Sequence, residues 1–181
     1  MNKKIVLVGA GGSGKDYAKK ILVDLGLTEH ISYTTRPPRT DEVGGKDYHF
    51  ITENNMLKMI TENEFIQSCY FPNGFVYGTH IKEFYDKELF IMTPDALEKL
   101  NDEIRSMCHV VYFNIDPEVR LERLSKRKNA DNPNKRLRTD NEQFQDFIDF
   151  DAEIVDEKFD LDILIRSLPI EYQTKIISTN I

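Results

Sequence analysis

A glycine-rich heptapeptide near the start of the chain restricts the fold more than any other feature of the sequence. The segment Gly9-Ala10-Gly11-Gly12-Ser13-Gly14-Lys15 fits the pattern GxxxxGK, and it lies between an apolar run at 5–8 and a helical pattern at 14–25. Such a loop binds phosphates, because its glycines let successive backbone N–H groups converge on one point. The helix N-terminus adds partial positive charge, and Lys15 reaches the outer phosphates. We therefore expect a nucleotide at this loop.

The residue after the loop departs from the usual pattern. Asp16 stands where Ser or Thr normally offers a hydroxyl group to Mg²⁺. A carboxylate also binds Mg²⁺, directly or through water, but it adds negative charge near the phosphates. An acidic residue in the first turn of a helix also interacts favourably with the helix dipole. Asp16 is therefore a candidate magnesium ligand, and a purely helix-stabilising role is the alternative.

Strands and helices alternate along the chain. Apolar runs predict buried strands of a parallel sheet at 5–8, 89–92 and 109–115, and a last strand at 161–165. Helices are expected at 14–25, after Thr93-Pro94, at 118–128, over 139–157 and after Pro169. Short strands, a helix starting near Thr52 and an Asn73-Gly74 hairpin turn predict a mixed β insertion at about 32–80. This order predicts an α/β fold with a parallel sheet.

Composition excludes several classes of protein. The 181 residues fit one compact domain, with the 40% hydrophobic and 30% charged residues of a globular protein. A net charge of −7 argues against a nucleic-acid binder, and no apolar run is long enough for a membrane span. Cys69 and Cys108 form no disulfide framework, and the four histidines show no zinc-binding pattern. These features favour a cytoplasmic protein.

One segment opposes the overall charge. From Arg120 to Arg138, five Arg and three Lys stand against two acidic residues, which gives a local charge of +6. A basic segment on an acidic chain suggests a small polyanion, such as a nucleotide, as partner. The alternative is a solvated helix face.

A second motif carries paired arginines. In Ser32-Tyr33-Thr34-Thr35-Arg36-Pro37-Pro38-Arg39, two arginines three residues apart and stiffened by prolines can converge on one phosphate. Together with the glycine loop, this stretch resembles the guanylate kinase family of nucleoside monophosphate kinases. The resemblance covers nearly the whole chain and continues at Asn63-Glu64-Phe65-Ile66, Tyr77-Gly78-Thr79 and Asn134-Lys135-Arg136-Leu137.

The resemblance implies a fold and a reaction. The fold is a P-loop NTPase core with three α/β/α layers at 1–31 and 85–181, a monophosphate-binding lobe inserted at 32–84, and a short lid at about 126–138. The reaction is transfer of the γ-phosphoryl group of ATP to GMP or dGMP with Mg²⁺. The implied partners are small-molecule nucleotides, and the implied protein is a cytoplasmic monomer or homodimer that binds neither nucleic acid nor membrane.

The resemblance also assigns residues. The acceptor's phosphate is held by Arg36, Arg39, Tyr48 and Tyr77, with Ser32 and Thr79 near its base or phosphate. ATP is held by Lys15 and the loop N–H groups. The arginines that approach the donor from the lid side are matched by Arg123, Arg127 and Arg136. Arg138 is the alternative to Arg136, because the lid is short and its alignment is loose.

The base-reading positions depart from the family. Guanine presents two hydrogen-bond donors, which the family reads with Glu and Asp, whereas this chain has Gln67 and Thr93. An amide has only one acceptor group, so another base, or a modified one, is an alternative acceptor. A Gly-Lys-Asp-aromatic sequence also resembles loops of phosphomevalonate kinases. A further alternative is an inactive guanylate kinase-like module that binds phosphoproteins, although the intact loop and Lys15 weigh against it.

Overall fold

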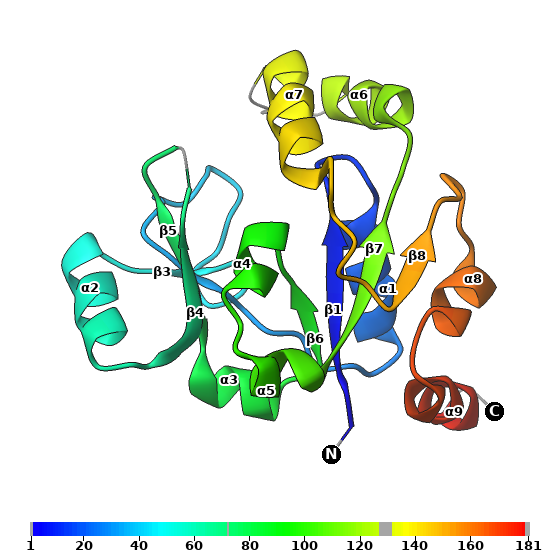
Figure 1. Ribbon diagram of the computed structural model, residues 1–181, viewed down its shortest axis with the longest axis horizontal. Coiled ribbons are helices and arrows are strands. Elements are labelled where there is room, and N and C mark those ends of the chain that lie inside the picture. Colours follow the sequence, from blue (N-terminus) through cyan, green and yellow to red (C-terminus); the bar gives the residue numbers. More distant parts are fainter. Residues whose placement is uncertain (1, 72, 127–131, 180–181) are drawn as a thin grey trace.

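The structure, a computed structural model, describes residues 2–71, 73–126 and 132–179 (Figure 1). A parallel sheet in the order β6-β1-β7-β8 forms its centre. The strands are β1 (Lys4–Gly9), β6 (Leu89–Ile91), β7 (Cys108–Phe113) and β8 (Ala152–Ile154). β1 is buried along its whole length, because β6 and β7 flank it and helices cover its faces. The predicted parallel sheet is confirmed.

Helices cover both faces of this sheet and make three layers. Successive strand side chains point to opposite faces, so Ile5 and Leu7 join one core cluster and Val6 and Val8 join the other. The first cluster includes buried residues of α1 (Lys15–Asp24), α8 (Leu161–Arg166) and α9 (Ile170–Thr179). The second includes buried residues of α3 (Ile81–Asp86), α4 (Pro94–Glu98) and α5 (Asp102–Ser106). The predicted α/β/α fold class is therefore confirmed.

A separate mixed sheet follows the order β3-β2-β5-β4. Its strands are β2 (Tyr33–Thr34), β3 (His49–Phe50), β4 (Phe65–Tyr70) and β5 (Val76–His80). β4 and β5 form the antiparallel hairpin predicted from Asn73-Gly74, where Gly74 has a φ of 85°. α2 (Glu53–Thr61) begins where expected, because Oγ1 of Thr52 accepts a hydrogen bond from the N–H of Asn55.

Two helices, α6 (Pro117–Ser125) and α7 (Pro133–Phe144), pack together beyond the carboxyl ends of β1 and β7 (Figure 1). The predicted start of α6 is confirmed, since Oδ1 of Asp116 accepts a hydrogen bond from the N–H of Glu118. The candidate Arg127 lies outside the described residues. Within the described ranges, no helix is long and apolar enough to cross a membrane.

The long helix expected over 139–157 is wrong. That expectation followed the polar and acidic residues of the stretch, but α7 ends at Phe144 and the chain then enters the sheet as β8. Aromatic packing determines this path. The ring of Tyr112 lies 5.7, 5.0 and 5.4 Å from the ring centroids of Phe144, Phe147 and Phe150. The free energy gained by packing three aromatic rings against one face of the sheet exceeds the free energy gained by extending an exposed helix.

The strand expected at 161–165 is also wrong, because this segment is helix α8. Oδ1 of Asp160 caps the helix by accepting a hydrogen bond from the N–H of Ile163. Leu164 is fully buried in the core cluster, whereas Leu161 is 44% exposed, so this short helix buries one face against the sheet. A five-residue apolar run does not distinguish a buried strand from a short helix.

A buried histidine makes the stability of the fold depend on pH. His30 is 8% exposed, its ring stacks on Phe90 at 5.0 Å, and its Nε2 has no hydrogen-bond partner among the described residues. Burial, followed by the positive charges of His49 and Lys87, lowers the pKa of His30 to about 3. Between this value and the ordinary value of about 6.5, the unfolded state therefore holds more protons than the folded state.

We expect this histidine to make the free energy of unfolding fall by up to about 1.4 kcal/mol for each pH unit below 6.5. His30→Phe keeps an aromatic ring on Phe90 and removes the titration, so the pH dependence should be shallower in the variant. Urea unfolding of both proteins between pH 4.5 and 7.5 measures the difference. Parallel curves would show that His30 does not titrate in this way.

Candidate active site

The glycine loop has the backbone that its sequence requires. Gly12 and Gly14 have φ values of 80° and 95°, which a residue with a side chain rarely adopts. A Cβ atom on Gly12 would lie 2.8 Å from the carbonyl oxygen of Arg120. Gly14 is the N-cap of α1, so the loop leads into the N-terminus of a helix. Lys15 is half-buried at the first helical position, and the loop is therefore shaped to bind an anion.

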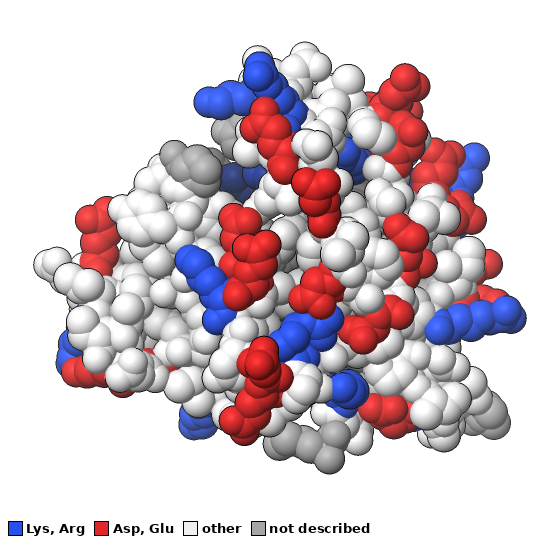
Figure 2. Space-filling view, in the orientation of Figure 1, with Lys and Arg blue, Asp and Glu red and all other residues white. Residues whose placement is uncertain are grey.

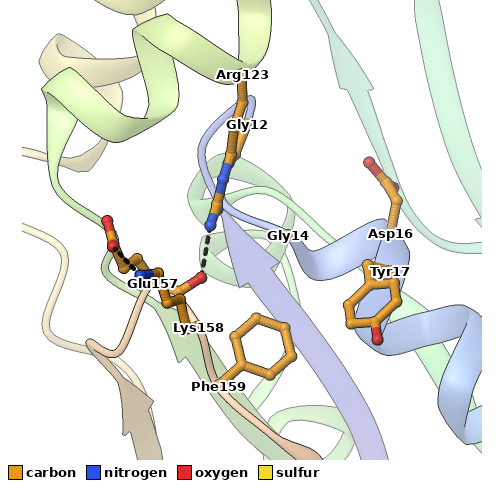
Figure 3. A pocket seen from close by; sticks show the side chains of 8 residues that line it. All are labelled: Gly12, Gly14, Asp16, Tyr17, Arg123, Glu157, Lys158 and Phe159. Carbon is orange, nitrogen blue, oxygen red and sulfur yellow. Dashed lines mark hydrogen bonds and ion pairs between the residues drawn. The ribbon is translucent and has the colours of Figure 1, made fainter.

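A pocket of about 380 Å³ opens beside the loop (Figure 3). It is lined by Gly12, Gly14, Asp16, Tyr17, Arg123, Glu157, Lys158 and Phe159. The guanidinium group of Arg123 forms part of the pocket wall. It is fixed there by hydrogen bonds that it donates to the carbonyl oxygens of Gly12 at 3.0 Å and Glu157 at 2.5 Å. A guanidinium plane and aromatic rings can hold a planar base.

Sequence reasoning missed the aromatic part of this pocket. Tyr17 of α1 is 61% exposed, and its ring lies 6.1 Å from the ring of Phe159. The apolar character of both residues gave no signal of a pocket, since core positions have the same character.

α7 brings one arginine to the loop and leaves another in solvent. Nε of Arg136 lies 3.0 Å from Oδ1 of Asp140, and Oδ2 of Asp140 accepts a hydrogen bond of 2.7 Å from the N–H of Gly11. Arg138 is 84% exposed at its side chain and pairs with Glu142 at 3.3 Å. The structure therefore places Arg136, and not Arg138, beside the glycine loop. Asp140 was missed, because the helix was expected to begin only at 139, which left Arg136 outside it and hid the helical spacing of four residues.

The second sheet carries a cationic cluster. Arg36 is buried, and its guanidinium lies 5.4 Å from the centroid of the Tyr48 ring. Its Nη2 donates to Oε1 of Glu42 at 2.8 Å, and its Nε donates to the hydroxyl of Tyr77 at 3.3 Å. The same carboxylate accepts a hydrogen bond of 2.8 Å from the backbone N–H of Arg39. Three of the four residues expected around one phosphate are thus in contact, and the fourth is tied to them by Glu42.

Charge in this cluster is compensated within the protein. The hydrogen bond from Arg36 is the main cause that lowers the pKa of Glu42, and the same bond raises the pKa of Arg36. Burial raises the pKa of Tyr48, so its hydroxyl stays protonated at neutral pH. Glu42 has a positioning role that its place in the motif did not reveal.

The expected base-reading residues have distinct surroundings. Nε2 of Gln67 donates to Oγ1 of Thr79 at 3.0 Å, and the thiol of Cys69 lies 3.5 Å from Oε1 of Gln67. Thr93 precedes α4, but its side chain makes no capping hydrogen bond. Its buried Oγ1 has no hydrogen-bond partner among the described residues, so capping of α4 does not account for this hydroxyl group. Ser32 is half-buried and its carbonyl accepts a hydrogen bond from the N–H of His49.

The described residues hold no group of three or more His, Cys, Asp or Glu side chains that could bind a metal. Asp16 is exposed in the first turn of α1 and lines the pocket beside the loop. Mg²⁺ at a nucleotide commonly takes one or two carboxylates and completes its shell with phosphate oxygens and water. A single carboxylate at this place fits that chemistry.

Comparisons with known proteins agree with this geometry. The family model described as guanylate kinase matches residues 1–165. A guanylate kinase of Onion yellows phytoplasma (strain OY-M) is 33% identical over 176 residues, which cover 87% of this chain and 81% of the relative. A crystal structure of guanylate kinase from Anaplasma phagocytophilum has a TM-score of 0.65 and 19% identity, covering 99% of this chain and 86% of that chain. At this identity the structural likeness shows the fold alone.

Other matches are partial. A guanylate kinase of Schizosaccharomyces pombe is 38% identical over 89 residues, which cover 48% of this chain and 44% of the relative. Protein lin-2 of Caenorhabditis elegans is 38% identical over 90 residues, which cover 48% of this chain and 8% of that protein. The matched segments thus span less than half of these two relatives.

Proposed function

This chain belongs to the guanylate kinase family, and we propose that it is an ATP-dependent nucleoside monophosphate kinase. It transfers the γ-phosphoryl group of ATP to GMP, dGMP or a related (deoxy)nucleoside monophosphate and forms the diphosphate. The observation that carries the proposal is that two separate groups of backbone N–H and cationic side chains, each suited to a phosphate, occur in one chain. One is the glycine loop with Lys15, and the other is the cluster of Arg36, Glu42 and Tyr77.

In this proposal ATP binds to the lobe formed by residues 1–31 and 85–181. The phosphates lie against the loop N–H groups and the ammonium group of Lys15. The base enters the pocket beside the loop, where Arg123, Tyr17 and Phe159 offer flat surfaces for stacking. The observed bonds of Arg123 to two carbonyl oxygens support this role, because they hold its guanidinium plane in place.

The acceptor binds to the lobe of residues 32–84. Its phosphate takes the place around Arg36, where Tyr48 and Tyr77 supply hydroxyl groups and Arg39 completes the charge. Arginine suits this position, because its planar fork binds two phosphate oxygens at once.

The reaction needs the neutralisation of charge more than a strong base. An oxygen of the acceptor's phosphate attacks the γ-phosphorus, the bond between that phosphorus and the bridging oxygen breaks, and ADP leaves with the electron pair. Lys15 and Arg136 stabilise the negative charge on the transferring group. Water would otherwise accept the phosphoryl group, so the proposal includes its exclusion by the lid expected at about 126–138, of which residues 127–131 lie outside the described ranges. Mg²⁺, when bound at Asp16, supplies further positive charge at the β- and γ-phosphates.

The proposal includes a selectivity for the acceptor's base that differs from strict selectivity for guanine. Two residues support this difference, Gln67 and Thr93. The hydrogen bond from Nε2 of Gln67 to Thr79 leaves only Oε1 to accept from a base. Guanine presents two donors at its reading edge, so one of them loses an acceptor that the family's Glu provides. An unpaired polar group costs about 1–3 kcal/mol, or about 5- to 150-fold in affinity. A base with alternating donors and acceptors suits this amide better.

The test of the function is turnover of ATP with a panel of ribo- and deoxynucleoside monophosphates, together with the Lys15→Ala variant. We expect the wild type to form ADP only when a monophosphate is present. The rate should fall about 100- to 1,000-fold in Lys15→Ala, because this variant lacks the ammonium group that contacts the transferring phosphates. Lys20→Ala, an exposed residue of the same helix, is the matched control and should keep full turnover. A folded wild type with no turnover on any acceptor, but with affinity for phosphopeptides, would support the inactive binding module instead.

Arg39→Lys tests the assignment of the acceptor site. Arg39 is 60% exposed at its side chain, so its replacement should leave the fold intact, whereas Arg36 is buried. An ammonium group cannot form the two-pronged bond, and we expect kcat/KM for the monophosphate to fall about 10- to 100-fold. The KM for ATP should stay constant, and Lys58→Gln on exposed α2 should change neither value. A rise in the KM for ATP alone would mean that donor and acceptor sites are exchanged.

Gln67→Glu tests the selectivity for the base. A carboxylate restores acceptors for both guanine donors, so kcat/KM for GMP relative to the other monophosphates should rise about 5- to 150-fold. Ser68→Asp adds a carboxylate on the opposite face of β4 and should leave the ratio unchanged. A wild type that already prefers GMP a hundredfold, with no gain in Gln67→Glu, would show that the amide reads guanine well.

A further inference from the structure

One carboxylate of α7 joins the glycine loop to an arginine. Oδ2 of Asp140 accepts a hydrogen bond of 2.7 Å from the N–H of Gly11, and Oδ1 lies 3.0 Å from Nε of Arg136. The loop and this carboxylate are in such close contact that a Cβ atom on Gly11 would lie 2.9 Å from Oδ2 and 3.4 Å from Nε of Arg136. The side chain of Asp140 is 5% exposed, so both bonds form away from solvent.

A second ion pair on α7 has the same spacing but differs in burial and in its contact with the loop. Arg138 and Glu142 have the same spacing of four residues, but their side chains are 84% and 67% exposed, and among the described residues neither has a hydrogen bond or ion pair to the loop. Basic and acidic side chains lie side by side on the exposed surface over α7 (Figure 2). Exposed pairs of this kind contribute little to stability. The pair of Arg136 and Asp140 differs because its carboxylate is buried and has a backbone partner in the loop. A buried carboxylate is costly unless it is paired in this way.

A buried arginine compensates the same charge from the neighbouring helix. Arg120 of α6 is 5% exposed, and it donates hydrogen bonds to the carbonyl of Ile115 at 3.0 Å and to Oδ1 of Asn141 at 2.5 Å. Its Nη1 is buried with no partner among the described residues. Burial lowers the pKa of Arg120, and Asp140 is the first of the charges that oppose this effect. Arg120 thus joins α6 to α7 through Asn141, the neighbour of Asp140 in the chain, while Asp140 itself joins α7 to the loop.

We propose that Asp140 is a positioning residue that holds the guanidinium of Arg136 against the glycine loop, where the γ-phosphoryl group is transferred. This inference rests on the proposed kinase function. Asp140 contacts Arg136 through Nε, the guanidinium nitrogen nearest the main chain, and so does not use the terminal nitrogens Nη1 and Nη2. Those terminal nitrogens form the fork that binds phosphate oxygens. A carboxylate that anchors the arginine at its Nε therefore orients the fork without occupying it.

The position of Arg136 matters because its own side chain is half exposed, at 51%. A long side chain in solvent populates many rotamers, and fixing it during the reaction would cost conformational entropy. The bond to Asp140 removes most of this freedom before the substrates bind. Catalytic groups that are held in place in advance stabilise a transition state more than groups that must be ordered during the reaction.

The experiment compares Asp140→Ala and the isosteric Asp140→Asn with Glu142→Gln as the matched control. We expect kcat to fall about 10- to 100-fold in Asp140→Ala and less in Asp140→Asn, which keeps one acceptor for Gly11. The affinity for a non-hydrolysable ATP analogue, measured by calorimetry, should stay within about threefold or become tighter, since a negative charge near the phosphates is removed. Asp140→Ala should have no further effect on kcat in an Arg136→Ala background.

Three outcomes would overturn the inference. If Asp140→Ala weakens the ATP analogue as strongly as it lowers kcat, or if its effect adds to that of Arg136→Ala, Asp140 only supports the loop. If kcat rises, Asp140 is a barrier to the donor and not a positioning residue.

A readout without turnover separates this inference from the proposed function. In ¹H–¹⁵N spectra of the free protein, the Gly11 amide and the Nε–H of Arg136 should shift in both Asp140 variants and stay in place in Glu142→Gln. An active wild type in which neither signal responds would overturn the role of Asp140. A wild type without turnover on any monophosphate would overturn the kinase function, and with it the catalytic role given to Asp140, even if both signals shift.

Discussion

The close approach between the glycine loop and α6 is the contact on which the rest of the site depends. The backbone of Gly12 lies so near the carbonyl of Arg120 that only a residue without a side chain fits there. This approach lets Arg123 reach the carbonyl oxygen of Gly12, and it holds α7, which packs on α6, above the loop. A loop that can bind phosphate and the helices that supply cations to it are thus built as one unit.

Most of the fold follows from local signals in the sequence. The apolar runs of β1, β6 and β7, the capping residues Thr52 and Asp116 and the hairpin turn at Asn73-Gly74 each act within a few neighbouring residues, and the structure has them where expected. The same holds for the backbone of the glycine loop, whose positive φ values its composition implies. The family resemblance, and not a local pattern, predicted that one site contains Arg36, Tyr48 and Tyr77.

The errors and omissions come from contacts between distant parts of the chain. β8 lies where a helix was predicted, because three phenylalanines pack around the ring of Tyr112. No local sequence pattern specifies these contacts. Gly11 and Asp140 are 129 residues apart, so their hydrogen bond could not be derived from the spacing of either motif. The apolar run of α8 was ambiguous from the start, because its length suits a strand and a short helix equally well.

The two arginines of the second sheet differ in how much conformational freedom their side chains keep. Arg36 is buried between aromatic rings and Glu42, so its orientation is fixed when the chain folds. Arg39 is held at its backbone N–H, and its side chain is 60% exposed with Nη1 at 3.9 Å from Oε1 of Glu42. An anion bound between them would therefore have one partner that is already oriented and one side chain that it must order, so the conformational entropy lost on binding would fall mainly on Arg39.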